Sequence, residues 1–425
     1  MGLALLFIVL AVLLIGGAPV AVALGAASLV YIFIAGLPPV TMLHTMINGV
    51  NSFTLLAVPF FIMVGHLMNT GGITTRIFTF ARALVGWLPG GLGHVNVGAS
   101  VIFAGMSGAA VADAGGLGNI EIKAMRDAGY DIDFSVGITA ASSTIGPIIP
   151  PSLPLIIYGV IASTSIGQLF AAGVVPGFMM AIALMIMVSW YARRRNYPRD
   201  EAFNFRNLGA ATKSAFLPLL TPAIIIGGIG TGAFTPTEAA VVAVVYALIL
   251  GGLVYRTLTW RHLLRVTMDT VETTAAILMI VATAAIFAWI LTANQSALHV
   301  TNFILGLTDN KHVILLLMMA VILVVGCFME TIAALTILVP VLLPVAATIG
   351  VDPVHLGIIV VLNLMIGLLT PPVGMVLYVL SRVSGVRFED CVRATAPFLV
   401  PLLIVLMLLV FIPELSLWLP TMLYR

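Results

Sequence analysis

Two proline-rich breaks are the segments of this chain best suited to chemistry. Residues 145–151 read Ile-Gly-Pro-Ile-Ile-Pro-Pro, and residues 366–372 read Ile-Gly-Leu-Leu-Thr-Pro-Pro. Proline has no backbone N–H group, so each proline inside a helix releases a carbonyl group one turn earlier. The hydroxyl groups beside the breaks belong to Ser142, Ser143, Thr144, Ser152 and Thr370. Released carbonyls next to hydroxyls suit an alkali cation, whereas the N-terminus of a half-helix attracts an anion.

A short turn precedes each break, and an acid lies at or near each turn. Residues 105–110 read Gly-Met-Ser-Gly-Ala-Ala, and residues 326–331 read Gly-Cys-Phe-Met-Glu-Thr. The acids are Asp113 and Glu330. A charge at membrane depth costs at least about 2.5–3.5 kcal/mol on insertion scales, so such residues usually have a function. Three interpretations stay open for each acid: a cation ligand, a protonatable coupling group, or a structural cap at the turn.

The turns and breaks recur at one fixed spacing. An offset of 221 residues, from Gly105 to Gly326, aligns both breaks without a gap and also pairs Asp131 with Asp352. In an apolar chain, chance matches of Gly, Pro and Asp are much rarer than those of Leu, Val or Ala. Broken segments in corresponding positions of two halves indicate a transporter whose site lies where the halves meet. The alternative is that the prolines only kink packed helices. We interpret Asp131 and Asp352 as helix caps.

The composition is that of a membrane protein. Of the 425 residues, 61% are hydrophobic and 8% are charged, whereas a soluble domain has about 25% charged residues. Residues 1–75 contain no Lys, Arg, Asp or Glu, which predicts successive membrane spans rather than a cleaved signal peptide. Cys327, Cys391 and the scattered histidines form no metal-binding pattern, and no basic cluster with interleaved aromatics indicates nucleic acid.

The basic residues predict the topology. The segment at 192–213 is the only long polar one and carries six Lys or Arg residues, so the positive-inside rule places it in the cytoplasm. Counted outward from there, 16 of the 18 Lys and Arg residues fall inside if the two halves have opposite orientations and the N-terminus is outside. We therefore predict an all-α membrane protein of about ten transmembrane helices and two re-entrant hairpins, in two inverted-topology repeats.

The boundaries of the two repeats follow from these patterns. The first repeat is expected at residues 1–191, with its hairpin at 95–124 and its broken helix at 133–158. A cytoplasmic basic linker is expected at 192–213. The second repeat is expected at 214–425, with its hairpin at 313–344 and its broken helix at 354–380. Hairpins and broken helices would move together as an elevator against a scaffold formed by residues 2–68 and 215–255.

Several motifs together resemble a known family. They are Ser-Gly at 107–108, Gly-Pro-Ile-Ile-Pro-Pro-Ser at 146–152, Met-Glu-Thr-Ile-Ala-Ala at 329–334, Leu-Val-Pro-Val-Leu-Leu-Pro at 338–344 and Leu-Thr-Pro-Pro-Val-Gly at 369–374. Over essentially the whole chain, the sequence is similar to the large membrane subunit of tripartite ATP-independent periplasmic (TRAP) transporters, whose fold is like that of the ion transporter superfamily. Family members often carry further Ser or Thr after the Ser-Gly turn, whereas here alanines follow and Asp113 is the next polar residue.

The resemblance implies a sodium-driven elevator transporter in the bacterial inner membrane, and not an enzyme. It would import a small organic acid anion that a periplasmic binding protein delivers. A small four-helix membrane subunit is expected as a separate chain, because this sequence begins directly at the large subunit. Sodium ions would be co-transported, and no organic cofactor is expected. No Walker motif is present, so ATP is not the expected energy source. The second candidate is a stand-alone sodium/dicarboxylate symporter without a binding protein.

The turns and breaks supply the expected site residues. Substrate is expected at Ser107, Gly108, Pro151, Ser152, Thr370 and Pro372. Sodium is expected at Ser107, Gly146, Glu330, Thr331, Thr370 and Gly374. The possible coupling acids are Asp113 and Glu330.

One enzyme class offers a remote alternative. Gly-Met-Ser-Gly at 105–108 matches the G-x-S-G motif of rhomboid-type intramembrane serine proteases. Such chemistry requires a histidine within hydrogen-bond reach of the serine. No histidine lies deep in an expected span after residue 108, and Phe328 stands at the position of the second turn that corresponds to Ser107. The sequence therefore favours transport over proteolysis.

Overall fold

The regular structure of this protein is helical. The computed structural model describes residues 2–200, 203–296, 299, 301–302, 306, 308 and 310–424, and no strand occurs in these ranges. Within them, eight helices are long and apolar enough to cross a membrane. Four shorter apolar helices accompany them: Gly2–Ile15, Val20–Ile34, Pro353–Gly367 and Met375–Ser384. The all-α membrane fold is therefore confirmed, while the opposite orientation of the two halves stays a prediction.

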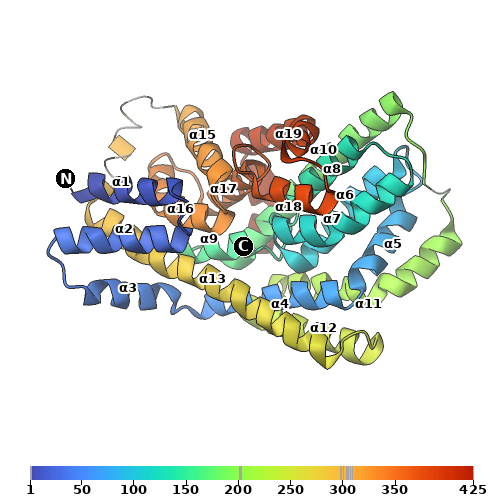
Figure 1. Ribbon diagram of the computed structural model, residues 1–425, viewed down its shortest axis with the longest axis horizontal. Coiled ribbons are helices and arrows are strands. Elements are labelled where there is room, and N and C mark those ends of the chain that lie inside the picture. Colours follow the sequence, from blue (N-terminus) through green and yellow to red (C-terminus); the bar gives the residue numbers. More distant parts are fainter. Residues whose placement is uncertain are drawn as a thin grey trace.

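The N-terminal helices pack at one end of the molecule. Figure 1 shows α1 (Gly2–Ile15), α2 (Val20–Ile34) and α3 (Val40–Val50) beside α13 (Trp260–Ala293), and both α2 and α3 contact α13. Buried side chains of α1, α2 and the end of α13 form a core cluster of their own. From there α13 reaches α4 (Ala57–Thr70). One helix thus joins the N-terminal end to the middle of the molecule.

Three further helices and two short turns complete this side of the fold. The helices are α5 (Ile73–Val85), α11 (Phe205–Gly230) and α12 (Pro236–Ile249), and the turns are η1 (Phe53–Leu56) and η2 (Leu250–Val254). Both α4 and α11 pack against α12, and α11 also packs against α5. A capping box starts α12: the Thr235 hydroxyl accepts from the Glu238 amide, and the Glu238 carboxylate accepts from the Thr235 amide.

The first half contains two helices joined by a short turn and, after them, two helices separated by a proline break. The hairpin consists of α6 (Gly91–Ser107) and α7 (Ala110–Asp127). The proline break separates α8 (Ile132–Ser143) from α9 (Leu153–Ile161), and α10 (Ile166–Arg195) follows. Ser152 caps α9 by accepting a hydrogen bond from the Leu155 amide at 3.2 Å.

The second half has the same order of elements. Its hairpin consists of α15 (Lys311–Phe328) and α16 (Thr331–Thr348), and its break separates α17 (Pro353–Gly367) from α18 (Met375–Ser384). They are followed by α19 (Phe388–Phe411) and α20 (Glu414–Leu423). A shift of 221 residues carries both ends of α7 onto both ends of α16. The peptide bonds Pro150–Pro151 and Pro371–Pro372 are both cis.

The hairpin of each half packs against a helix of the other half. Helix α18 packs on α7, and the corresponding helix of the first half, α9, packs on α16. Likewise α19 packs on α8, and α10 packs on α17. Each hairpin therefore lies against the segment that follows the break of the other half. This exchange is the contact pattern of two related halves that enclose a common centre.

The expected basic linker at 192–213 includes the end of one long helix and the start of the next. Helix α10 continues through Arg195, and α11 begins at Phe205, so much of the basic segment at 192–213 is helical. The Asn204 side chain accepts a hydrogen bond from the Arg206 amide at 2.9 Å and starts α11. Basic side chains extend a helix beyond the apolar region easily because their charged ends reach water. Helix α20 was not expected from the sequence.

One of the two predicted aspartate caps is wrong. Asp352 does cap α17, where its carboxylate accepts hydrogen bonds from the amides of Val354 at 2.7 Å and His355 at 3.4 Å. Asp131 occupies the same position before α8, but its side chain makes no cap hydrogen bond. It accepts instead from Arg195 at 2.9 Å and from the Tyr197 hydroxyl at 2.6 Å. The nearby guanidinium outcompetes neutral backbone amides for the carboxylate.

Candidate functional site

The tip of the first hairpin lies directly on the proline break of its own half. Helix α6 ends at Ser107, and Gly108 has a left-handed φ of 59°. The Gly108 carbonyl accepts a hydrogen bond from the Leu153 amide at 3.4 Å. A methyl group built on Gly108 would lie 2.4 Å from the carbonyl oxygen of Pro151. Only glycine permits both this backbone conformation and this close approach.

The other end of the break reaches the same tip. A methyl group built on Gly146 would lie 4.0 Å from both the Ser107 Oγ and the Ala109 amide nitrogen. Ser152, at the far end of the break, is fully buried and donates a hydrogen bond to the Pro147 carbonyl. The structure therefore brings together all the first-half residues that the sequence assigned to the site: Ser107, Gly108, Gly146, Pro151 and Ser152.

Most hydroxyl groups at the first break bond to nearby protein groups. Ser143 and Thr144 donate to the carbonyl oxygens of Ala140 and Ala141 at 2.8 and 2.6 Å. Ser107 differs, because its hydroxyl is buried and has no hydrogen-bond partner. Buried polar groups are nearly always hydrogen-bonded, so the free hydroxyl of Ser107 is the oxygen of this site best placed to meet a ligand.

The second tip contacts its break in a related way. The Cys327 carbonyl accepts a hydrogen bond from the Val373 amide at 3.1 Å. A methyl group built on Gly367 would lie 2.8 Å from the Cα of Gly326, so the two backbones touch. The Thr370 hydroxyl donates to the Ile366 carbonyl at 2.8 Å. Each hairpin tip is thus held to its own break by a backbone hydrogen bond.

Glu330 acts as a helix cap in this structure. Its carboxylate accepts hydrogen bonds from the amides of Ile332 at 2.9 Å and Ala333 at 3.3 Å, at the start of α16. Of the three interpretations for this acid, the cap is the one that the geometry displays. Thr331 is buried directly beside it. Gly374, with a left-handed φ of 57°, lies close to the carbonyl oxygens of Leu368 and Thr370.

The two groups of site residues differ in exposure. The first break is buried from Gly146 to Ser152, whereas Pro371 and Pro372 of the second break are exposed. No hydrogen bond between described residues joins the site residues of one half to those of the other. The halves meet through the packing of α7 on α18 and of α9 on α16. Within each half the expected site residues lie together in the structure, and the packing of helices connects the two groups.

Asp113 is fully enclosed near the first tip. Its side chain is 2% exposed, and neither carboxylate oxygen has a hydrogen-bond partner. Glu121, on the same helix, is also buried without a partner for Oε1. The sequence analysis did not single out Glu121, because Lys123 and Arg126 beside it give the segment the character of an exposed loop. Its spacing of eight residues from Asp113, which places both acids on one face of a helix, is the signal that could have revealed Glu121.

Among the described residues, no cluster of side chains forms a metal centre and no histidine bonds to Ser107. No group of three or more His, Cys, Asp or Glu residues within this part of the chain could hold a metal ion. The Ser107 hydroxyl bonds to no histidine. Oxygen atoms of backbone carbonyls and hydroxyls are therefore the ligands that the tips and breaks offer to a cation.

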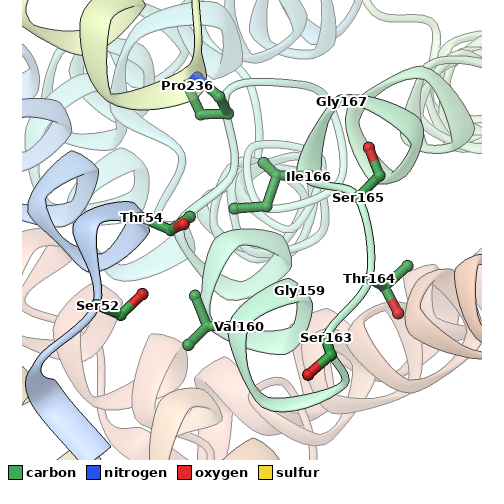
Figure 2. Close-up of a pocket in the computed structure, with 10 residues that line it drawn as sticks. All are labelled: Ser52, Thr54, Gly159, Val160, Ser163, Thr164, Ser165, Ile166, Gly167 and Pro236. Atoms are coloured by element: carbon green, nitrogen blue, oxygen red, sulfur yellow. The ribbon is translucent and has the colours of Figure 1, made fainter.

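A separate pocket lies away from the tips. A cavity of about 380 Å³ lies between the start of η1, the start of α12 and the loop joining α9 to α10 (Figure 2). Its hydroxyl groups belong to Ser52, Thr54, Ser163, Thr164 and Ser165. No charged side chain and no predicted site residue lines it. This pocket is therefore distinct from the site at the hairpin tips.

A comparison with known protein families identifies the family of this chain. Residues 7–415 match the family described as the tripartite ATP-independent periplasmic transporter, DctM component. This chain belongs to that family. The permease subunit is 49% identical to the sialic acid TRAP transporter large permease protein SiaM of Vibrio cholerae serotype O1. The aligned region of 409 residues covers 96% of each chain. Membership makes it a multi-pass transport protein and not an enzyme, as the sequence predicted.

Two further comparisons extend this result. The permease subunit is 40% identical to the 2,3-diketo-L-gulonate TRAP transporter large permease protein YiaN of Escherichia coli K12, over 88% of each chain. Among solved structures, the YdaH transporter of Alcanivorax borkumensis covers 89% of this chain and 87% of its own, with a TM-score of 0.64 at 14% sequence identity. At that identity the likeness shows a shared transporter fold and nothing of the substrate.

Proposed function

We propose that this permease subunit imports a hydroxylated sugar acid across the bacterial inner membrane together with sodium ions. Two relatives support the substrate class, because sialic acid and 2,3-diketo-L-gulonate, named for them, are both carboxylated sugar derivatives. The observation that carries the coupling is the pair of bonds between tip and break, Leu153 to Gly108 and Val373 to Cys327. A cation bound at such a junction would hold the tip and the break together.

Each half offers oxygen ligands for one sodium site. In the first half these are the free Ser107 hydroxyl and the carbonyls released around Gly146. In the second half they are the carbonyls facing Gly374, the hydroxyls of Thr331 and Thr370, and any lone pair of Glu330 not used by the cap. Unwound carbonyls of broken helices are suited to sodium. Bound cations would offset the negative ends of the half-helices.

The substrate anion would then meet sodium, hydroxyls and helix N-termini. Neither α6 nor α15 has a Lys or Arg residue in its membrane part, since Lys311 lies at the very start of α15. Ser152 and Pro151 on one side, and Thr370 and Pro372 on the other, stand next to the starts of α9 and α18. The positive ends of these two helices favour a carboxylate. This division explains how the site binds an anion without a buried arginine.

The working cycle requires movement and partners. The hairpins and broken helices of both halves would move as one unit against the scaffold of α1 to α4, α11 and α12, with the N-terminus on the periplasmic side. A periplasmic binding protein would deliver the substrate, and a small four-helix membrane subunit would complete the permease. Both partners follow from the family, whose transporters are tripartite.

Uptake into proteoliposomes tests the proposal. The complete permease with its binding protein should accumulate a labelled sugar acid when sodium is higher outside. Replacing sodium by choline or potassium at constant pH should abolish uptake. Full activity with a proton gradient alone would reject sodium coupling. Comparable uptake without the binding protein would support the stand-alone symporter instead.

A further inference from the structure

Two buried acids share one face of α7. Leu117 lies four residues after Asp113, and Glu121 lies four residues after Leu117. Side chains four residues apart lie on one face of a helix, so these three share a face of α7. Asp113 is 2% exposed and Glu121 is 1% exposed. Three of their four carboxylate oxygens are buried without a hydrogen-bond partner: both of Asp113 and Oε1 of Glu121. Buried polar atoms in this state are rare in native proteins and require an explanation.

Polar side chains of α6 and α8 connect the levels of these two acids. The Ser100 hydroxyl lies beside the Asp113 carboxyl without a hydrogen bond of normal geometry. One turn away on α6, Asn96 donates to the Thr139 hydroxyl at 2.7 Å. Thr139 packs against Gly118, where an added methyl group would lie 2.9 Å from its Cγ2, one turn before Glu121. Ser100, Asn96 and Thr139 are all buried. A column of buried polar side chains thus leads from Ser100, beside Asp113, to Thr139, whose methyl group contacts α7 one turn before Glu121.

The second half shows that the fold does not need this column. At the offset of 221 residues, Asp113 corresponds to Ala334 and Glu121 to Leu342. The column residues Ser100, Asn96 and Thr139 correspond to Val321, Leu317 and Val360. The equivalent helices α15, α16 and α17 nevertheless pack on one another as α6, α7 and α8 do. An apolar seam is sufficient for this architecture, so the acids serve another purpose.

Other charged groups around α7 do not compensate the acids. On α6, His94 contacts Ser189 at 3.2 Å, and on α8, Asp133 pairs with Arg195 at 2.9 Å. The charged residue on α18 is Arg382, which is exposed. On α4, which touches α7 through Asn69 and Gly116, the titratable residue is His66, and it lies near Asp269. No ion pair within the described ranges involves either acid.

We infer that Asp113 and Glu121 form a monovalent-cation relay inside the first-half bundle, separate from the two tip sites. Each acid holds a proton or a sodium ion while it is buried, and exchange of that cation along the Ser100–Asn96–Thr139 column is coupled to transport. An ionised carboxylate buried without a partner is strongly unfavourable, so a small cation must neutralise it. The relay rests on the proposed cation-coupled transport and adds a second place of coupling to it.

Variants of Glu121 test the relay in the complete transporter. Glu121→Gln removes the charge and keeps the shape, and Glu121→Leu copies the residue that the second half already packs at this place. Uptake by each variant is measured against sodium concentration at fixed pH, and against pH at saturating sodium. Glu389→Gln, an exposed acid at the start of α19, is the matched control. Sodium-dependent protection against thermal unfolding of the purified permease gives a second measurement that does not need transport.

The result expected is a change of about fivefold or more in the half-saturating concentration of one cation, with no change in the control. A shift in the sodium profile and in the sodium protection identifies sodium as the bound cation, and a shift in the pH profile identifies the proton. Profiles and protection equal to the wild type in both Glu121 variants would overturn the inference. Wild-type uptake that depends on neither cation would instead overturn the proposed function, and the relay with it.

Discussion

Replacing Gly108 by alanine should separate the first hairpin tip from its break. The left-handed φ of 59° costs a residue with a side chain about 1–2 kcal/mol. The added methyl group would also lie 2.4 Å from the Pro151 carbonyl oxygen, which belongs to the backbone and cannot rotate away. Overpacking of this kind costs about 1–3 kcal/mol more. The tip must therefore shift, and its hydrogen bond with Leu153 should be lost.

Gly129→Ala is the matched control for this substitution. Gly129 has a left-handed φ of 82°, but a methyl group built there would meet nothing within 4 Å. Gly129→Ala therefore has the free-energy cost of a left-handed backbone conformation, but its new methyl group meets no neighbouring atom. The difference between the two variants isolates the contact of tip and break, about 1–3 kcal/mol, or about 5- to 150-fold in apparent sodium affinity if the cation binds at this junction.

Sodium-driven uptake and thermal unfolding should be measured on both variants in the same preparation. We expect Gly108→Ala to need a much higher sodium concentration for half-maximal uptake, while Gly129→Ala behaves like the wild type apart from a small loss of stability. Equal sodium dependence in the two variants, at equal protein levels, would refute the reasoning that the junction of tip and break holds the cation.

Three further outcomes follow from the same contacts. Ser107→Ala should raise the sodium concentration for half-maximal uptake by about 5- to 150-fold, whereas Ser143→Ala, whose hydroxyl already bonds to a carbonyl, should change sodium titrations of uptake little. Gly367→Ala should impair uptake strongly, because its methyl group would meet the backbone of Gly326; wild-type transport rates would contradict this. Arg195→Gln breaks partly exposed ion pairs, so we expect only about 0.2–1 kcal/mol of lost stability in a thermal melt, and a larger loss would mean that these pairs hold α10 to the start of α8 more strongly than exposed ion pairs do.

The positions of the tips and breaks were readable from the sequence because their causes are local. Proline ends a helix wherever it removes an N–H group, and glycine permits a left-handed turn without help from distant residues. The hairpin bounds expected from the sequence therefore lie within a few residues of the ends of α6, α7, α15 and α16. The offset of 221 residues also indicates which helices of the two halves correspond. The same local causes bring Ser107 and Gly146 close together, while their role at a cation site stays a prediction.

Side-chain partners were decided only by the tertiary structure. The sequence treated Asp131 as a cap, but folding brings Arg195 to it from the far end of α10, and a charged donor wins over backbone amides. Glu330 became a cap because Met329 and Glu330 are extended and aim the carboxylate at the amides of α16. The partner of Asp131 therefore comes from a distant segment, whereas the cap formed by Glu330 is a local contact that the sequence had left as one of three interpretations.

Burial of Glu121 is the clearest case. Its neighbours Lys123 and Arg126 are exposed, and they suggest a solvated helix end. Helices α6, α8 and α18 pack on α7 and enclose Glu121 and Asp113, whereas Lys123 and Arg126 stay exposed. A helix places side chains four residues apart on one face whatever their chemistry, so the sequence determines which residues share a face. Which face is sealed depends on the helices that pack against it, and only the assembled fold determines that.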